Sequence, residues 1–472
     1  MAQPTDTIAA VATASGAGAI GIVRVSGPQV RAIGQALTGK RLRPRTMSLC
    51  ALRDAGGAIL DHALVLLFAG PRSATGEDVL ELHAHGSPVV LNLLLARALD
   101  LGARVARPGE FTERAFLNGK LDLVQAEAVA DLIASDSAAA ARAASRSLEG
   151  DFSREVRGLL EALVRLRAWL EAALDFPEEE IDFLSAPQLT ADLAALQSQL
   201  IELLAAARRG VILRDGLHVV IVGRPNTGKS SLLNALAQSA RAIVTAIPGT
   251  TRDVLREGIN IDGIVLTLVD TAGLRESGDV IEREGMRRAR AELARADVAI
   301  LVTDSTHAAA DTALLEDCAE DAARLIVHNK IDVSGESAHV ERAAGEIHMY
   351  ISAQRGDGLA ELRSELARLG GRGDGAQGAF SARARHVDAL ERVAAHLRAA
   401  DAALRLDHAG ELAAEELRQA QHALGEITGD YTTDDLLGAI FSTFCIGKCR
   451  SSARTTPRLR RRVGRLRSGA CS

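Results

Sequence analysis

One glycine-rich segment constrains the fold of this chain more than any other: residues 223–230, with the sequence GRPNTGKS. It follows the apolar run 217–222 and precedes a helical pattern at 231–236. A strand, a glycine loop and a helix in this order are typical of a phosphate-binding P-loop, in which backbone N–H groups and the helix N-terminus face an anion. We expect Lys229 to lie against the β- and γ-phosphates of a nucleotide and the Ser230 hydroxyl to ligate Mg²⁺.

Two downstream motifs suit the γ-phosphate side of such a nucleotide. Residues 248–253 (PGTTRD) are typical of a switch loop whose threonine closes on the metal. Residues 270–273 (DTAG) come directly after the strand-like run 264–269. We therefore expect Asp270 to reach Mg²⁺ through water and the Gly273 N–H to meet the γ-phosphate.

Two more motifs suit the base. Residues 329–332 (NKID) follow an apolar run, and Ser352 and Ala353 follow another at 347–351. An aspartate at position 332 offers two acceptor oxygens to the paired N–H donors of guanine, which adenine cannot match. Each motif alone is weak evidence, but all of them in this order predict a GTP-binding domain. The NKID motif also argues against a kinase that uses ATP.

The residue that orients the attacking water is left open by these motifs. Leu274 stands where many GTPases carry a glutamine, and an apolar side chain cannot orient water. The candidates are three carboxylates shortly downstream, Glu276, Glu282 and Glu284. No arginine is obviously placed as a finger, but Asn226 could hold a monovalent cation against the phosphates and so supply the same positive charge.

The composition fits a globular protein of about two to four domains. The 472 residues carry a net charge of -6, so any contact with nucleic acid must be local, and 3% aromatic residues argue against base stacking as the main mode of RNA binding. The cysteines are odd in number and lack metal spacing: Cys50, Cys318, Cys445, Cys449 and Cys471. Without a signal peptide or a long apolar run, the sequence predicts a reduced, cytoplasmic protein.

The first 120 residues are expected to form a small α/β domain. Residues 19–27 and 63–68 are strand-like, and residues 79–86 alternate so that Glu81, His83 and His85 share one face. The histidines lack a further ligand nearby, so a zinc site is not favoured. A buried carboxylate needs a partner, and for Glu81 a structural ion pair and a ligand contact both remain open.

Helical periodicity begins near residue 121, is broken once at Pro177, resumes from 189 to 208, and returns from 382 to about 444. We therefore predict α/β plus α: a Ras-like P-loop GTPase domain (213–376) inserted in a discontinuous helical domain (121–212 and 377–448), after an N-terminal domain (1–120). Two separate helical domains are the alternative. The arginine-rich tail 449–472 is expected to be disordered; it could bind RNA phosphate or be a product of frameshift or read-through.

Longer motifs in all three regions resemble one family. They are TGED at 75–78, RPGEFTERAFLN at 107–118, DFPEEEIDF at 175–183 and FCIGK at 444–448. Over residues 1–448 the chain resembles the MnmE (TrmE) family of tRNA modification GTPases. The resemblance implies a homodimer of N-terminal domains that each bind 5-formyltetrahydrofolate or a related tetrahydrofolate. It also implies a heterotetramer with the flavoprotein MnmG (GidA). Together the two proteins would add an aminomethyl or carboxymethylaminomethyl group to C5 of the wobble uridine of certain tRNAs.

The resemblance also assigns residues. Glu282 matches the water-orienting glutamate, which acts with Lys229 in catalysis. Folate contacts fall on Arg24, Glu81, Lys120 and Lys448; potassium contacts on Asn226, Thr245, Ile247 and Thr250; Mg²⁺ ligands on Ser230 and Thr251. The full set of GTP contacts is Asn226, Thr227, Gly228, Lys229, Ser230, Ser231, Thr245, Ala246, Ile247, Pro248, Gly249, Thr250, Thr251, Asp270, Thr271, Ala272, Gly273, Asn329, Lys330, Asp332, Ser352 and Ala353. GTPases of this kind are activated when two G domains meet face to face, with potassium in place of an arginine finger.

Two departures from the family pattern stand out: Ala246 replaces the usual aspartate, and Ala74 replaces the usual aromatic residue before the TGED motif. Two other classes of protein fit this sequence less well. A ribosome-assembly GTPase switch is the alternative function, but it predicts a KH module or a second G domain, and the sequence has neither pattern. A dynamin-like protein would need a membrane-binding element, which the sequence lacks.

Overall fold

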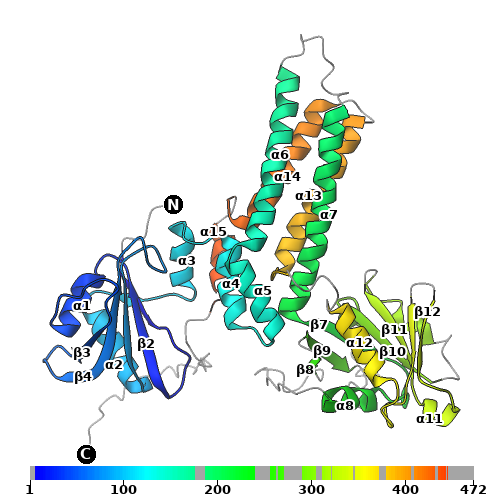
Figure 1. Ribbon diagram of the computed structural model, residues 1–472, viewed down its shortest axis with the longest axis horizontal. Helices are drawn as coiled ribbons and strands as arrows, with labels where there is room; N and C mark the ends of the chain where they lie inside the picture. Colours follow the sequence, from blue (N-terminus) through cyan, green and yellow to red (C-terminus); the bar gives the residue numbers. More distant parts are fainter. Residues whose placement is uncertain are drawn as a thin grey trace, which may run out of the picture. The chain divides into compact units, whose positions relative to one another are not determined.

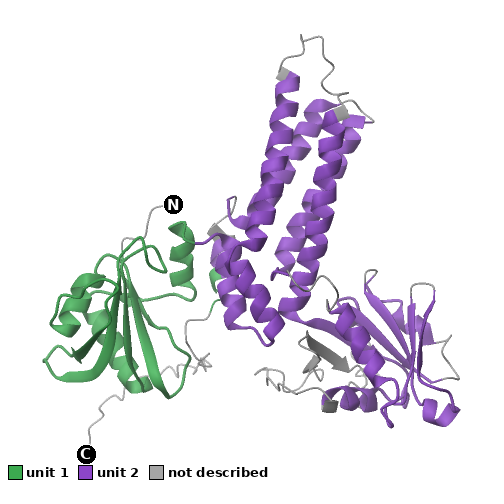
Figure 2. Ribbon diagram, viewed as in Figure 1, with its two compact units in different colours: residues 1–120, 441–472 green, residues 121–440 purple. Residues whose placement is uncertain are grey.

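The computed structural model describes residues 6–175, 187–239, 256–261, 264–270, 290–304, 311–319, 322–343, 346–370, 379–405, 409–430, 434–442 and 444. It divides into two compact units, residues 1–120 with 441–472, and residues 121–440 (Figure 2). None of the helices in the described ranges has the length and apolar character that crossing a membrane requires.

The first unit is built on a six-stranded sheet. Apolar side chains that alternate along its strands pack on two helices, α1 (Val30–Thr38) and α2 (Pro88–Asp100), and form one core. The opposite face of the sheet carries Arg24, Glu81 and His83, as the alternation predicted. The strand order is β3 (Ser48–Arg53), β4 (Ile59–Phe68), β5 (Val79–Gly86), β2 (Gly18–Ser26), β1 (Ile8–Val11), β6 (Arg104–Val105), and a third helix, α3, spans Glu110–Leu117.

The second unit begins with helices. Asp122 caps the first of them in a capping box with Gln125, which explains why the helical pattern starts there. Four long helices lie side by side, α6 and α7 from the first helical block and α13 and α14 from the second (Figure 1). The bounds are α4 Leu123–Ile133, α5 Ala138–Leu148, α6 Asp151–Asp175, α7 Pro187–Asp215, α13 Ala384–Arg405, α14 Gly410–Thr428 and α15 Asp434–Ser442.

A single hydrophobic core joins the two helical blocks. It takes side chains from residues 124–207 and from residues 380–427. Charged residues join the blocks as well, at the two points where the chain leaves the helices and returns to them. Arg214 at the end of α7 and Arg383 before α13 both donate to Asp131 Oδ1, over 2.9 and 2.7 Å. The helical domain is therefore discontinuous in sequence.

Between these two points the chain forms a seven-stranded sheet. Its order is β12 (His339–Ala343), β13 (Glu346–Tyr350), β11 (Ala323–His328), β10 (Val298–Thr303), β7 (Leu217–Val222), β9 (Ile264–Asp270), β8 (Arg256–Ile261), and its inner strands are parallel. Helices in the described part of this region include α8 Lys229–Ser239, α11 Ile331–Ser334 and α12 Leu359–Leu369, with a 3₁₀ turn η3 at Thr312–Leu315. Strand β7 lies between β10 and β9, where the strand order reverses, and ligands of such sheets bind beyond the carboxyl ends of the strands at this point.

Candidate functional site

The predicted phosphate loop connects β7 to α8 and depends on two glycines. Gly223 has φ 151°, and a Cβ there would lie 2.2 Å from the Val302 carbonyl oxygen. Gly228 has φ 99°, and a Cβ there would lie 2.2 Å from the Asn329 Nδ2. A larger residue at either position would push the loop away from its neighbours, so the glycines set both the turn and its close contacts.

The lysine of the loop lies inside the turn. Lys229 Nζ donates to the carbonyl oxygens of Gly223 and Arg224, over 2.8 and 2.6 Å, and Thr227 Oγ1 donates to the Arg224 carbonyl over 2.9 Å. The lysine is buried, whereas Ser230, the next residue of α8, is exposed. The arrangement keeps the ammonium group at the centre of the loop, where a phosphate-binding lysine is required.

The motifs predicted to contact the base are joined to this loop by one side chain. Asn329 Nδ2 donates to the Thr227 carbonyl over 2.9 Å, and Asn329 Oδ1 accepts from the Ala353 N–H over 3.0 Å. Lys330 Nζ donates to the Asn226 carbonyl over 2.5 Å. Asn329 thus holds together three loops, distant in the sequence, that follow strands β7, β11 and β13.

Asp332 completes the base side. Ser352 Oγ donates to its Oδ1 over 2.6 Å, and this hydrogen bond is the main cause that lowers the pKa of the Asp332 carboxyl below its ordinary value. The carboxylate is therefore ionised at neutral pH and accepts hydrogen bonds only. An ionised acceptor with two oxygens suits the paired N–H donors of guanine.

One further contact of the loop was not predicted. The Arg224 guanidinium donates through Nε to Asp311, and Thr303 Oγ1 donates to the other oxygen of the same carboxylate over 2.8 Å. Asp311 is buried and lies 87 residues from Arg224 along the chain. The sequence holds no local signal for this pairing, because it depends on how the chain returns after β10.

A second polar cluster, the Arg24–Glu81–His83 cluster, lies on the face of the six-stranded sheet opposite α1 and α2. Arg24 of β2 is directly opposite Glu81 of β5. Its Nε and its terminal nitrogen both contact Glu81 Oε1, at 2.9 and 2.7 Å, and His83 Nε2 lies 3.0 Å from Glu81 Oε2. The Arg24 guanidinium also lies over the Phe111 ring, 5.8 Å from its centroid.

The electrostatics of this cluster keep Glu81 charged. Burial raises the pKa of Glu81, but the hydrogen bond from His83 and the charge of Arg24 outweigh it and lower the pKa overall. The side chains remain partly exposed, at 32% for Arg24, 14% for Glu81 and 25% for His83. The cluster is therefore an ionised, accessible carboxylate held between two nitrogen donors.

Comparisons with known proteins match nearly the whole chain. A family model described as "GTP-binding protein TrmE N-terminus" matches residues 7–120, and one described as "MnmE helical domain" matches residues 123–445. The tRNA modification GTPase MnmE of Azoarcus sp. (strain BH72) is 54% identical over 449 residues, which cover 94% of this chain and 99% of that protein. The tRNA modification GTPase MnmE of Stutzerimonas stutzeri (strain A1501) is 54% identical over 456 residues, which cover 95% of this chain and 100% of that protein.

The chain belongs to the MnmE (TrmE) family of tRNA modification GTPases. The predicted family is thus confirmed, and so is the predicted fold class, a P-loop GTPase domain between the parts of a helical domain and after an N-terminal α/β domain. The predicted domain boundaries stay a prediction.

Within this MnmE-family chain, several predicted site residues lie outside the described residues. They are Thr245, Ala246, Ile247, Pro248, Gly249, Thr250, Thr251, Thr271, Ala272, Gly273, Glu282 and Lys448, together with the alternatives Glu276 and Glu284 and the tail 449–472. Asp270 is described as the last residue of β9, paired with Ile221 of β7. None of the hydrogen bonds or ion pairs among the described residues joins Lys120 to the Arg24–Glu81 pair.

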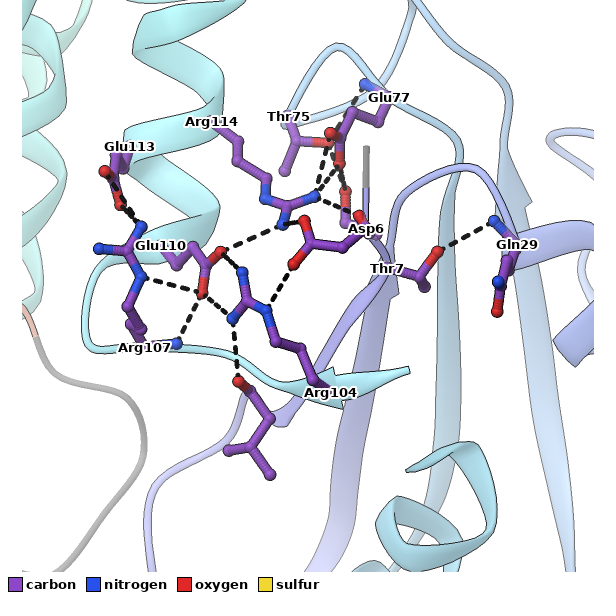
Figure 3. Close-up of polar contacts among 12 residues, drawn as sticks. Asp6, Thr7, Gln29, Thr75, Glu77, Arg104, Arg107, Glu110, Glu113 and Arg114 are labelled. Atoms are coloured by element: carbon purple, nitrogen blue, oxygen red, sulfur yellow. Dashed lines mark hydrogen bonds and ion pairs between the residues drawn. The ribbon is translucent and has the colours of Figure 1, made fainter. Parts of the chain in front are cut away.

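The long motifs of the N-terminal region meet in another charged cluster, which is centred on Arg114 (Figure 3). Arg114, fully buried, donates to Asp6, Glu77 and Glu110, and Arg104 donates to Asp6 and Glu110. Asp6 lies near the chain start, Glu77 in the TGED motif and Arg104 on β6, while Glu110 and Arg114 lie on α3. The cluster therefore holds α3, which carries Phe111, against the sheet. Sequence reasoning gave Arg114 no role, because its partners lie up to 108 residues away.

Proposed function

We propose that the chain hydrolyses GTP in order to drive the modification of tRNA. In this proposal it acts in the cytoplasm with the flavoprotein MnmG, and adds an aminomethyl or carboxymethylaminomethyl group to C5 of the wobble uridine with a one-carbon unit from a tetrahydrofolate. The observation that supports the nucleotide half most is the Asn329 bridge, because it joins the phosphate loop to the motifs predicted to contact the base. Family membership supports the tRNA half.

Each described residue of the nucleotide site has a distinct task. Lys229 places positive charge among the phosphates, and the Gly223–Gly228 loop offers backbone N–H groups to their oxygens. Ser230, exposed in the first turn of α8, would hold Mg²⁺ with Thr251. Asp332 recognises guanine. A bound Mg²⁺ neutralises charge that develops on the phosphates during hydrolysis.

Potassium and a second G domain would complete the catalytic site. Asn226, in the phosphate loop, has φ 64° and is exposed, so its side-chain amide oxygen is available to a bound cation. With Thr245, Ile247 and Thr250 it would hold K⁺, and Glu282 would orient the attacking water. We propose that these groups come together when two G domains meet, so hydrolysis should be much faster in potassium than in sodium.

The Arg24–Glu81–His83 cluster fits a reduced folate. The pterin ring of a folate presents paired N–H donors, which a carboxylate such as Glu81 accepts side by side. Arg24, Lys120 and Lys448 would suit the carboxylate groups of the same ligand. The ionised state and partial exposure of Glu81 support this assignment.

The same sheet face supports the proposed homodimer. Leu49 and Leu64 are paired across strands β3 and β4, and Leu64 is paired with His83 on β5. Leu49 is 66% exposed and Leu64 is 41% exposed. An apolar patch beside the Arg24–Glu81–His83 cluster would be covered if the N-terminal units of two chains pair there.

Two experiments test the proposal. Asp332→Asn should lower GTP affinity about 100-fold and improve binding of xanthosine triphosphate, because xanthine has a carbonyl where guanine has an amino group. Equal affinity of the wild type for ATP and GTP would contradict the nucleotide half. For the tRNA half, nucleosides from a strain that lacks the family protein should regain the modified wobble uridine when this chain is supplied, as mass spectrometry would detect. Failure to regain it would contradict that half.

A further inference from the structure

The two oxygens of Glu81 are held by different residues. Both contacts from Arg24 go to Oε1, whereas Oε2 contacts His83 Nε2 at 3.0 Å. Among the residues that the structure describes, no other side chain reaches Oε2. A carboxylate is an acceptor, so His83 must donate this hydrogen bond through Nε2–H.

This second contact decides how the carboxylate plane is oriented. The last torsion of a glutamate is broad, so a carboxylate held at one oxygen can still turn. Contacts at both oxygens restrict that rotation. The donors themselves are well fixed, because β5 is paired with β4 on one side and β2 on the other, and His83 lies two residues from Glu81 on the same face. Oε1 accepts one hydrogen bond, from Arg24 Nε, and Oε2 accepts one, from His83 Nε2, so each oxygen retains one of its two lone pairs for a ligand.

We propose that His83 is a positioning residue for folate recognition. It holds the Glu81 carboxylate in the orientation in which the free lone pairs of both oxygens face a 2-amino-4-oxo pyrimidine edge. His83 acts through Glu81 and need not touch the ligand itself. The inference rests on the proposed folate binding at the Arg24–Glu81–His83 cluster and adds the residue that prepares its carboxylate.

The test is titration of the full-length chain with 5-formyltetrahydrofolate in a calorimeter. His83→Ala should weaken binding about tenfold, as the loss of one hydrogen bond to a charged group implies. His83→Gln should bind within about threefold of wild type, because a glutamine amide can donate to the same oxygen. Thermal unfolding should be unchanged in both variants, since His83 is partly exposed.

A matched control is available on the same strand. His85 faces the same side as His83 and contacts a carboxylate, but its partner is Asp61, at 2.8 Å. His85→Ala should leave folate affinity unchanged. Wild type that binds no folate would overturn the proposed folate function itself. Wild type and His83→Ala that bind equally would overturn the positioning role alone, and so would His83→Gln that binds as weakly as His83→Ala.

Discussion

Two glutamates of this chain have the same kinds of partner in opposite surroundings. Glu81 contacts an arginine and a histidine on a partly exposed sheet face. Glu127, on α4, contacts Arg385 through both oxygens at 2.8 and 2.7 Å, and His386 at 2.9 Å. The Glu127 side chain is 2% exposed, against 14% for Glu81. The types of residue in a cluster therefore do not separate a proposed binding site from a structural one.

The partners of Glu127 reveal what it does. Arg385 also donates to the carbonyls of Glu426 and Ile427 at the end of α14, so Glu127 connects α4 to two helices of the second sequence block. Burial raises the pKa of Glu127, but the charges and hydrogen bonds of His386 and Arg385 lower it overall, so the carboxylate is ionised. At 2% exposure Glu127 holds helices together, whereas Glu81, at 14%, retains the access that a ligand needs.

The largest effect that sharpens this comparison is on stability. Glu127→Ala should reduce the free energy of unfolding of the helical domain by about 3 kcal/mol or more, because it leaves the buried His386 and the partly buried Arg385 without their carboxylate. Glu81→Ala should cost less than about 1 kcal/mol, since its ion pair is partly exposed. The chain's one tryptophan, Trp169, packs against the helical core, so its fluorescence in urea would report the transition. An equal loss of stability in Glu127→Ala and Glu81→Ala would contradict the distinction between a structural and an accessible glutamate.

A pH dependence should follow from the same buried cluster. Burial, and then the charge of Arg385, lower the pKa of His386 below 6.5. His386 therefore binds a proton more readily in the unfolded chain than in the folded chain. Its contribution to the free energy of unfolding is fully present above a pH of about 6.5 and is lost as the pH falls below that value. Glu127, whose pKa is also lowered, adds a loss in the same direction below about pH 4.5. The urea midpoint reported by Trp169 should fall from pH 7 to pH 5, and His386→Gln should flatten that slope.

A smaller effect concerns the shape of the arginine. Arg24→Lys keeps the charge but removes the planar fork that contacts Glu81 and lies over Phe111. Folate affinity should fall about tenfold, while nucleotide affinity and the unfolding transition stay the same. Calorimetric titrations with both ligands would measure this. An unchanged folate affinity would mean that only the charge of Arg24 matters.

The sequence was most informative where function is carried by adjacent residues. The phosphate loop was predicted because strand, glycines, lysine and helix are contiguous, and the face of Glu81 was predicted because side chains alternate along a strand. The ion pair of Glu81 could not be predicted without the register of β2 on β5, because the two partners lie 57 residues apart in the sequence. The Glu127 cluster was missed because His386 lies 259 residues away and only the shared helical core brings it near.

The most direct test of the account compares the two glutamates as glutamines. Wild type, Glu81→Gln and Glu127→Gln would be titrated with 5-formyltetrahydrofolate at a temperature where all three are folded, and their unfolding would be followed through Trp169. We predict that Glu81→Gln loses at least about 30-fold in affinity with no loss of stability. Glu127→Gln should lose stability and keep its affinity. Wild type that does not bind the ligand, or Glu81→Gln that binds it as wild type does, would contradict the account.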